Sequence, residues 1–114
     1  MKASSVFSNI PDSITEEIFE TLLKTDHSKL ERIISLGQAT SPGEWYDQDD
    51  NEWVILFSGS AGLRFEGDKE ICVMNPGDYV FIPAHRRHRV KWTNANRKTV
   101  CRHCAISARN CGGN

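Results

Sequence analysis

From Leu30 onward, the chain is a succession of short apolar runs separated by turn-forming residues. The runs are rich in β-branched and aromatic residues, and each is shorter than a helix of ordinary length. Many short strands at this spacing are typical of an antiparallel sandwich or barrel, so the pattern predicts an all-β domain. The predicted strands are 30–36, 53–57, 61–66, 70–74, 79–82, 88–92 and 99–106.

The segment before these runs has a different pattern. Ser13 and Glu16 have the Ser-x-x-Glu spacing of a capping box, in which each side chain satisfies a free backbone amide of the first helical turn. Ile14, Ile18 and Leu22 then fall near one helical face. The predicted organisation is an extension at 1–29 with a helix at about 13–24, a β-barrel at 30–106 and a disordered tail at 107–114.

The composition is that of an ordinary globular domain. The 114 residues suit one domain, with 39% hydrophobic and 25% charged residues. A net charge of −1 favours neither nucleic acid nor an anionic membrane as a partner. No apolar run approaches the roughly 20 residues of a membrane span, and the start does not resemble a signal peptide. We therefore expect a cytoplasmic protein with reduced cysteines.

Two motifs carry the most specific information. Glu52 through Gly59 reads Glu-Trp-Val-Ile-Leu-Phe-Ser-Gly, and Gly77, Pro83 and His88 recur in the later segment Gly-Asp-Tyr-Val-Phe-Ile-Pro-Ala-His-Arg-Arg-His. In residue type and spacing, the first segment resembles the end of the first motif of the cupin superfamily, and the second resembles its second motif. Ile10-Pro11-Asp12 and the run from Trp45 to Asp49 are similar to segments of a subgroup of small single-domain cupins.

The resemblance covers roughly residues 6–100 and implies the fold. The expected structure is a single-domain cupin jelly-roll β-barrel of the RmlC-like, cupin-2 type, with the short N-terminal α-helix packed outside it. The resemblance also implies a homodimer, because such barrels often pair through their edge strands and so cover them.

Strand alternation indicates which side chains face the interior. Glu52 shares a strand face with Val54 and Leu56, and His88 shares one with Val90 and Trp92. Both faces are apolar, so Glu52 and His88 are expected to point into the barrel. A buried carboxylate and a buried imidazole need partners, which can be each other, a metal or a ligand.

The metal site that the resemblance implies is incomplete. Cupin metals are typically held by three imidazoles and one carboxylate, and only Glu52 and His88 match that set. The two missing histidines correspond to Tyr46 and Gln48 or, with a gap one residue longer, to Trp45 and Asp47. Glutamine and aspartate bind hard cations through oxygen, whereas tryptophan does not bind. The candidate ligands for a divalent Mn, Fe, Ni or Zn are Glu52, His88, Gln48 and Asp47.

Other polar groups have simpler interpretations. His85 is expected to be exposed in the turn after Pro83, and the acidic run 47–52 lacks the glycine of an EF-hand loop. The basic residues near His88 are expected to be solvated or paired with acids. Cys101 and His103 would share one face of the last strand, opposite Cys104, but the roles of these residues and of Cys111 stay open.

Three functions agree with these observations. The first is a non-enzymatic module that binds a small polar molecule in the barrel. The second is a metal-dependent isomerase or oxygenase, with Glu52 and His88 as ligands and Tyr46 or His85 as the acid or base. The third is a ligand-free structural or interaction barrel. No catalytic residue is assigned, and the expected ligand-binding residues are Tyr46, Gln48, Glu52, His88 and Trp92.

Overall fold

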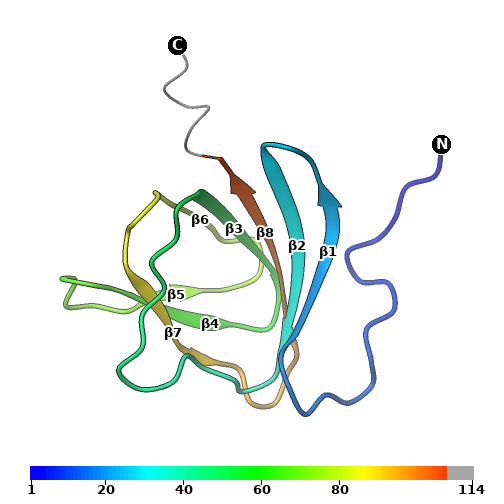
Figure 1. Cartoon of the computed structure of the whole chain (residues 1–114). Helices are drawn as coiled ribbons and strands as arrows, with labels where there is room; N and C mark the ends of the chain where they lie inside the picture. Colours follow the sequence, from blue (N-terminus) through cyan, green and yellow to red (C-terminus); the bar gives the residue numbers. More distant parts are fainter. Residues whose placement is uncertain (108–114) are drawn as a thin grey trace.

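The computed structural model describes residues 1–107 and contains eight strands in two sheets that face each other (Figure 1). The strand order is β1-β2-β8-β3-β6 in the larger sheet and β5-β4-β7 in the smaller one. All neighbouring strands are antiparallel, which confirms the predicted all-β jelly roll. The strands are β1 Ile18–Lys24, β2 Ser28–Ser35, β3 Asn51–Ser58, β4 Ala61–Phe65, β5 Cys72–Met74, β6 Tyr79–Ile82, β7 His88–Thr93 and β8 Thr99–Ile106.

The predicted N-terminal helix is wrong. Residues 1–107 contain no helix, and most of the segment assigned to it forms strand β1. β1 pairs with β2 from Ile18 opposite Ile34 to Lys24 opposite Lys29, and Thr25 closes the hairpin through bonds to Ser28. The open edge of β2 presents backbone N–H and C=O groups that need partners. Strand β1 satisfies these groups together with its own, whereas a short helix would satisfy only its own.

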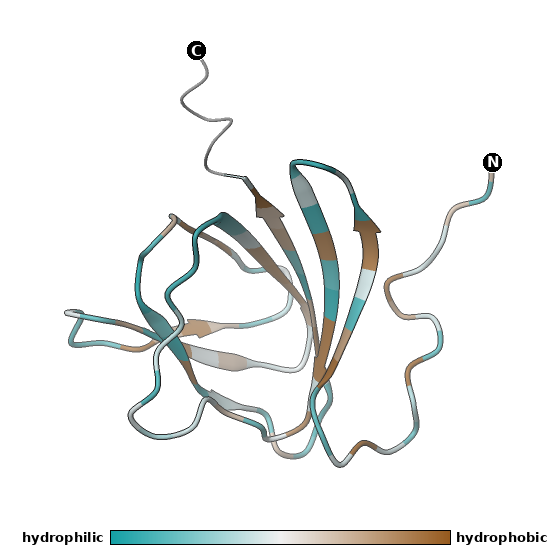
Figure 2. Cartoon of the chain, in the orientation of Figure 1, coloured by the Kyte–Doolittle hydropathy of each residue, from teal (hydrophilic) through white to brown (hydrophobic). Residues whose placement is uncertain are grey.

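The core lies between the two sheets. Alternate residues of β3 are buried, and Val54 and Leu56 meet Ala61 and Leu63 of β4 across the interior. Met74 of β5 and Ile82 of β6 complete this cluster. Figure 2 shows that the long connection before β3 and the connection between β4 and β5 are mainly hydrophilic, which agrees with their position on the surface.

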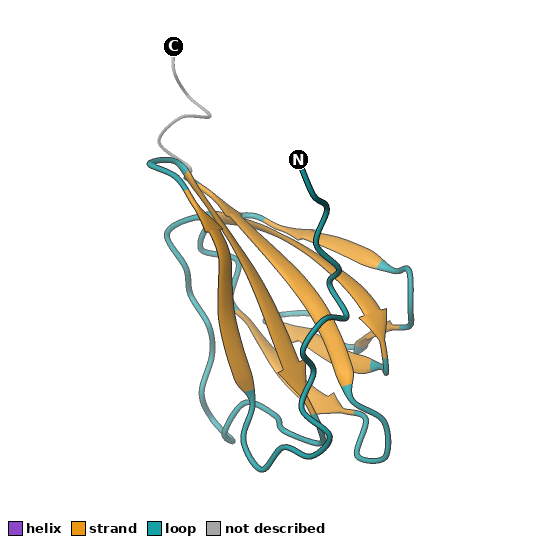
Figure 3. Cartoon of the chain, turned by 90° about the vertical axis from the view of Figure 1, so that its right-hand side faces the viewer, coloured by secondary structure: helices purple, strands orange, loops and turns teal. Residues whose placement is uncertain are grey.

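The outer face of the larger sheet is partly covered by the N-terminal segment, which runs across it in Figure 3. Arg32 of β2 is only 4% exposed and donates hydrogen bonds to the carbonyl oxygens of Val6 and Ser8. The Phe7 ring meets the Phe57 ring edge-on, with 6.1 Å between centroids. The extension is therefore held by specific contacts rather than by a helix.

The last described residue, Ser107, is also held by a hydrogen bond. The Ser107 amide donates to the carbonyl oxygen of His27 at 2.8 Å, and the remainder of the predicted tail, 108–114, lies outside the described residues. Among residues 1–107, no helix is long and apolar enough to span a membrane.

Candidate functional site

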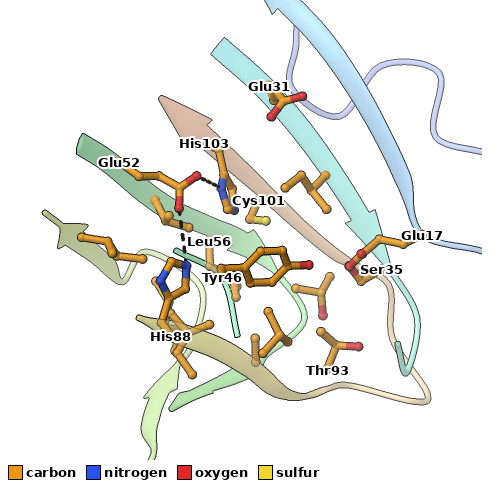
Figure 4. A pocket seen from close by; sticks show the side chains of 18 of the residues that line it. Glu17, Glu31, Ser35, Tyr46, Glu52, Leu56, His88, Thr93, Cys101 and His103 are labelled. Carbon is orange, nitrogen blue, oxygen red and sulfur yellow. Dashed lines mark hydrogen bonds and ion pairs between the residues drawn. The ribbon is translucent and has the colours of Figure 1, made fainter. Parts of the chain in front are cut away.

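A cavity of about 130 Å³ lies between the two sheets (Figure 4). Residues of both sheets line it, together with Tyr46 and Gln48 from the connection before β3. Much of its wall is aliphatic, including Leu56, Leu63 and Val90. Against this apolar wall, a small number of polar side chains stand out, and their arrangement defines the candidate site.

Glu52 and His103 form the central polar contact. His103 Nδ1 donates to Glu52 Oε2 at 2.8 Å, between the inner faces of the neighbouring strands β8 and β3. Glu52 is 6% exposed, and burial alone raises the pKa of its carboxyl. The hydrogen bond and charge of His103, with a smaller contribution from His88, outweigh burial and bring the pKa of Glu52 below its ordinary 4.5.

The pKa of His103 is shifted in the opposite direction, upward. Burial lowers the pKa of its imidazole, but hydrogen bonds with Cys101 and Glu52 and the negative charge of Glu52 raise the pKa of His103 to about 10. At neutral pH, this histidine is therefore an imidazolium paired with the Glu52 carboxylate. The pair is fixed in place because both residues lie on central strands of the larger sheet.

His88 approaches the same carboxylate from the smaller sheet. Its Nδ1 contacts the carbonyl oxygen of Arg86 at 2.8 Å, which places a proton on Nδ1. Its Nε2 lies 3.9 Å from Glu52 Oε1, too far for a hydrogen bond. Glu52 Oε1 has no hydrogen-bond partner among the described residues although it is buried. Two polar atoms thus converge on the cavity without satisfying each other.

Tyr46 and Gln48 both line the cavity. Tyr46 forms an isolated bridge with His88, donating its amide to the His88 carbonyl at 2.7 Å and accepting in return at 3.1 Å. The two rings lie 5.6 Å apart, and Tyr46 is 41% exposed, so its phenol stands at the rim of the cavity. Gln48 lines the cavity, while its carbonyl oxygen accepts from the amide of His85.

Trp92 does not line the cavity. The pairing of β4 with β7 shifts between Gly62, opposite Trp92, and Leu63, opposite Val90, so Lys91 is an extra residue in β7. This bulge reverses the alternation, and Thr93 rather than Trp92 lines the cavity with His88 and Val90. The expectation that Trp92 shares the inward face is therefore wrong.

Asp47 and His85 stand outside the cavity. Both side chains are at least half exposed, and His85 Nδ1 lies 2.8 Å from Asp47 Oδ1. That hydrogen bond, with the charges of Asp47 and Asp49, outweighs the opposing effect of desolvation and raises the pKa of His85 above its ordinary value. His85 lies in the turn, as expected, with a positive φ of 64°.

The donor set does not fit a resident metal. Within residues 1–107, no group of three or more His, Cys, Asp or Glu side chains is placed to hold an ion. Of the candidate ligands, Glu52 and His88 converge, Gln48 lines the cavity, and Asp47 is engaged by His85 on the outside. Glu52, the carboxylate that matches the cupin ligand set, already accepts a hydrogen bond from His103 through Oε2.

The polar residues that the sequence did not assign come from two places. Cys101 and His103 share the inward face of β8, as alternation indicates, but pairing of His103 with Glu52 depends on the two strands being neighbours. Glu17 and Ser35 also line the cavity, and Ser35 Oγ donates to Glu17 Oε2 at 2.6 Å. Glu17 was not predicted to line the cavity because it falls within the predicted helix at 13–24. Cys111 lies outside the described residues.

The basic residues around His88 are engaged on the outside, as expected. Arg86 pairs with Asp68, and Arg87 pairs with Glu66 at 2.7 Å. The guanidinium of Arg89 lies 5.8 Å from the ring of Trp45. The cavity lining includes no side chain of this cluster apart from His88 itself.

Comparison with known proteins identifies the family. The family model described as Cupin domain matches residues 33–101, more than half of the chain. The chain belongs to the cupin family. This cupin is 46% identical to a putative mannose-6-phosphate isomerase from Ralstonia eutropha JMP134, with a TM-score of 0.90 over 95% of this chain and 100% of that one.

More distant structures share the fold of this cupin. A cupin superfamily protein from Desulfitobacterium hafniense DCB-2 is 17% identical, with a TM-score of 0.69 over 86% of this chain and 84% of that one. The EutQ protein of Clostridium difficile is 9% identical, with a TM-score of 0.65 over 81% and 68% of the two chains. No curated protein sequence matches the chain.

Proposed function

We propose that this cupin binds a small polar molecule in the cavity between its two sheets. The observation that carries the proposal is Glu52 Oε1, which is buried without a hydrogen-bond partner among residues 1–107 and lies 3.9 Å from His88 Nε2. Leaving a buried polar atom unpaired costs about 1–3 kcal/mol, and more for a charged group. A bound molecule that donates to this oxygen removes that cost.

The composition of the cavity wall supports the same proposal. Small-molecule sites are mostly apolar, with a few polar groups that set the orientation of the ligand. Here, aliphatic residues of both sheets form much of the wall, and the polar groups that line it include Glu52, His88, His103 and Tyr46. The exposed phenol of Tyr46 places one of these groups where a ligand would enter.

The test is a binding screen on the intact protein. Sugars, amino acids, amines and organic acids would be screened by thermal shift, and hits confirmed by calorimetric titration. Ala61→Leu is the matched variant, because Ala61 lines the cavity from the smaller sheet and a larger side chain there fills it. Hits should be lost in Ala61→Leu, provided that its own melting is cooperative. If no compound shifts the melting temperature of the unmodified protein, the proposal fails.

A metal-dependent isomerase is the second candidate, favoured by the 46% identity to the Ralstonia protein, a putative mannose-6-phosphate isomerase. The incomplete donor set counts against it. Metal analysis of untagged protein, with an isomerisation assay on mannose 6-phosphate, separates the two. Stoichiometric metal together with turnover would replace the binding proposal. An oxygenase would require a redox-active metal such as Mn, Fe or Ni, and the same metal analysis tests for it.

The ligand-free barrel lacks its expected signature. Glu52 and His88 bonded to each other with no cavity around them would favour that function, whereas the two lie 3.9 Å apart beside a cavity. The homodimer implied by the family resemblance stays a prediction, which the molar mass in solution would check against the 12.9 kDa of one chain.

A further inference from the structure

We infer that the cavity selects a small primary ammonium ion, bound between Glu52 and His88, and rejects phosphorylated sugars. This inference rests on the proposed binding function and specifies its ligand class. An ammonium ion differs from mannose 6-phosphate, the substrate that the name of the Ralstonia protein gives. Three features of the cavity carry it: the hydrogen-bonding character of its free atoms, the sign of its charge and its size.

The free atoms are acceptors. Glu52 Oε2 is occupied by His103, which leaves Oε1 open to the cavity. The carbonyl of Arg86 holds a proton on His88 Nδ1, so the uncharged form of this ring presents a lone pair at Nε2. The 3.9 Å between Oε1 and Nε2 places both within reach of one ammonium nitrogen. Such a nitrogen carries several donors and no acceptor, so it satisfies both atoms at once.

The charge of the lining has the sign that attracts a cation. The lining includes three acidic side chains, Glu17, Glu31 and Glu52. Glu31 is compensated in part by Lys29 at 3.2 Å, but neither lysine nor arginine is among the residues that line the cavity. Phosphate recognition depends on such groups or on clustered backbone amides. A phosphorylated ligand would meet carboxylates instead.

The size of the cavity excludes a hexose phosphate from its enclosed part. A cavity of about 150 Å³ holds one benzene molecule, and this cavity measures about 130 Å³. A short alkylamine fits that space with its chain against Val54, Leu56 and Leu63. The ring of Tyr46 at the rim, 5.6 Å from that of His88, adds an aromatic face beside the cation.

The experiment compares ligands of one shape and different charge. Butylammonium, 1-butanol and butyrate would be titrated calorimetrically into the intact protein in the presence of a chelator, with mannose 6-phosphate as a fourth probe. A charge-assisted hydrogen bond contributes about 1.5–3 kcal/mol, so butylammonium should bind roughly 10-fold or more tightly than 1-butanol. Butyrate and mannose 6-phosphate should show no measurable binding at the same concentrations.

Two matched variants locate the contact. Glu52→Gln keeps the shape of the side chain and should abolish the preference for butylammonium over 1-butanol. Glu66→Gln removes the same charge from an exposed residue that pairs with Arg87 outside the cavity, and should leave that preference unchanged. If Glu52→Gln does not fold, the ring nitrogen resonances of His88 in the unmodified protein take its place, and they should shift on titration with butylammonium.

The outcomes separate the inference from the function on which it rests. Equal or tighter binding of the alcohol, the anion or the sugar phosphate overturns the inference and leaves the binding function standing. A preference for butylammonium over 1-butanol that survives Glu52→Gln overturns it as well, and so does amine binding that leaves the His88 resonances unmoved. If the screen described above finds no ligand of any class, both fail together.

Discussion

The two oxygens of the Glu52 carboxylate lie in different surroundings. Oε2 accepts from His103 at 2.8 Å, whereas Oε1 faces His88 at 3.9 Å without a hydrogen bond. A side chain that were purely structural would be expected to use both oxygens, because a buried carboxylate is costly unless its acceptors are satisfied. The asymmetry of this one residue is what distinguishes a site from a core ion pair.

The pH dependence of stability should report the Glu52–His103 pair. The pKa of His103 is raised to about 10, so its contribution is complete below its ordinary 6.5 and is lost as pH rises through about 10. The pKa of Glu52 is lowered, so its contribution is complete above 4.5 and is lost as pH falls further. Urea unfolding should therefore give the greatest stability between these values and a decline on the alkaline side.

His103→Gln removes the titrating group and should flatten the alkaline decline. It should also lower the free energy of unfolding near pH 6 by about 2 kcal/mol, the range for a hydrogen bond to a charged group. His103 is 22% exposed, so solvent screens part of the interaction. His27→Gln, at an exposed position, is the control and should leave the profile unchanged. Parallel profiles for the original protein and His103→Gln would show that the pair does not contribute.

At the scale of elements, the bulge in β7 decides which side chains enter the cavity. Lys91 has no partner in β4, and beyond it Trp92 faces away while Thr93 lines the cavity. Thr93 Oγ1 donates to the carbonyl oxygen of Gln38, which gives the inward hydroxyl a partner. Gly62 lies against the indole of Trp92, where a Cβ would come within 2.3 Å of Nε1. The tryptophan thus packs on the outer surface of the smaller sheet.

Gly59, in the turn between β3 and β4, provides a test of how closely this turn packs against Thr99 of β8. A Cβ on Gly59 would lie 2.3 Å from Thr99 Oγ1 and 2.6 Å from Thr99 Cα, and its φ is +76°. Gly67 has a φ of +90°, but nothing lies within 4 Å of the corresponding point. Gly67→Ala should cost about 1–2 kcal/mol, the strain of a left-handed residue. Gly59→Ala should cost about 2 kcal/mol more, because overpacking is added.

Urea unfolding of the two glycine variants measures that difference directly. Both changes add the same methyl group to a backbone of the same hand, so the strain of the left-handed conformation is common to them. Equal losses in the two variants would mean that the backbone of β8 moves away from Gly59 at no cost, against the close approach described here.

At the scale of the whole molecule, Arg32 connects the N-terminal segment to the larger sheet. Its guanidinium donates to the carbonyls of Val6 and Ser8 and to Glu20 Oε1, the last at 2.6 Å from Nη2. Arg32→Leu should release this segment, because the two carbonyls lose a charged donor that they share. Amide exchange around residues 5–10 should accelerate, and the free energy of unfolding should fall by about 2 kcal/mol.

Arg97→Leu is the control for that experiment. Arg97 lies exposed in the connection between β7 and β8, so the change removes a positive charge and leaves the bonds of Arg32 to Val6 and Ser8 in place. Its exchange pattern should match that of the original protein. Unchanged protection around residues 5–10 in Arg32→Leu would show that the Phe7–Phe57 contact holds the segment without the arginine.

The strands from Leu30 onward were predictable because local signals agree with the fold. Apolar runs of β-branched and aromatic residues alternate with turn formers, and each of the seven predicted strands exists with shifts of two residues or fewer. The capping-box pattern at Ser13 and Glu16 failed because the same apolar residues also suit a strand. Only the open edge of β2 decided between the two structures.

The sequence by itself determined the family, the strands from Leu30 onward and the inward direction of Glu52 and His88, since all three follow from residue spacing along one chain. Tertiary structure decided the chemistry of the site. Pairing of β8 with β3 brought His103 to Glu52, and the bulge at Lys91 exchanged Trp92 for Thr93. Strand order and register join residues far apart in sequence, and no local pattern specifies them. That is why the cavity and its unpaired oxygen appear only in the folded protein.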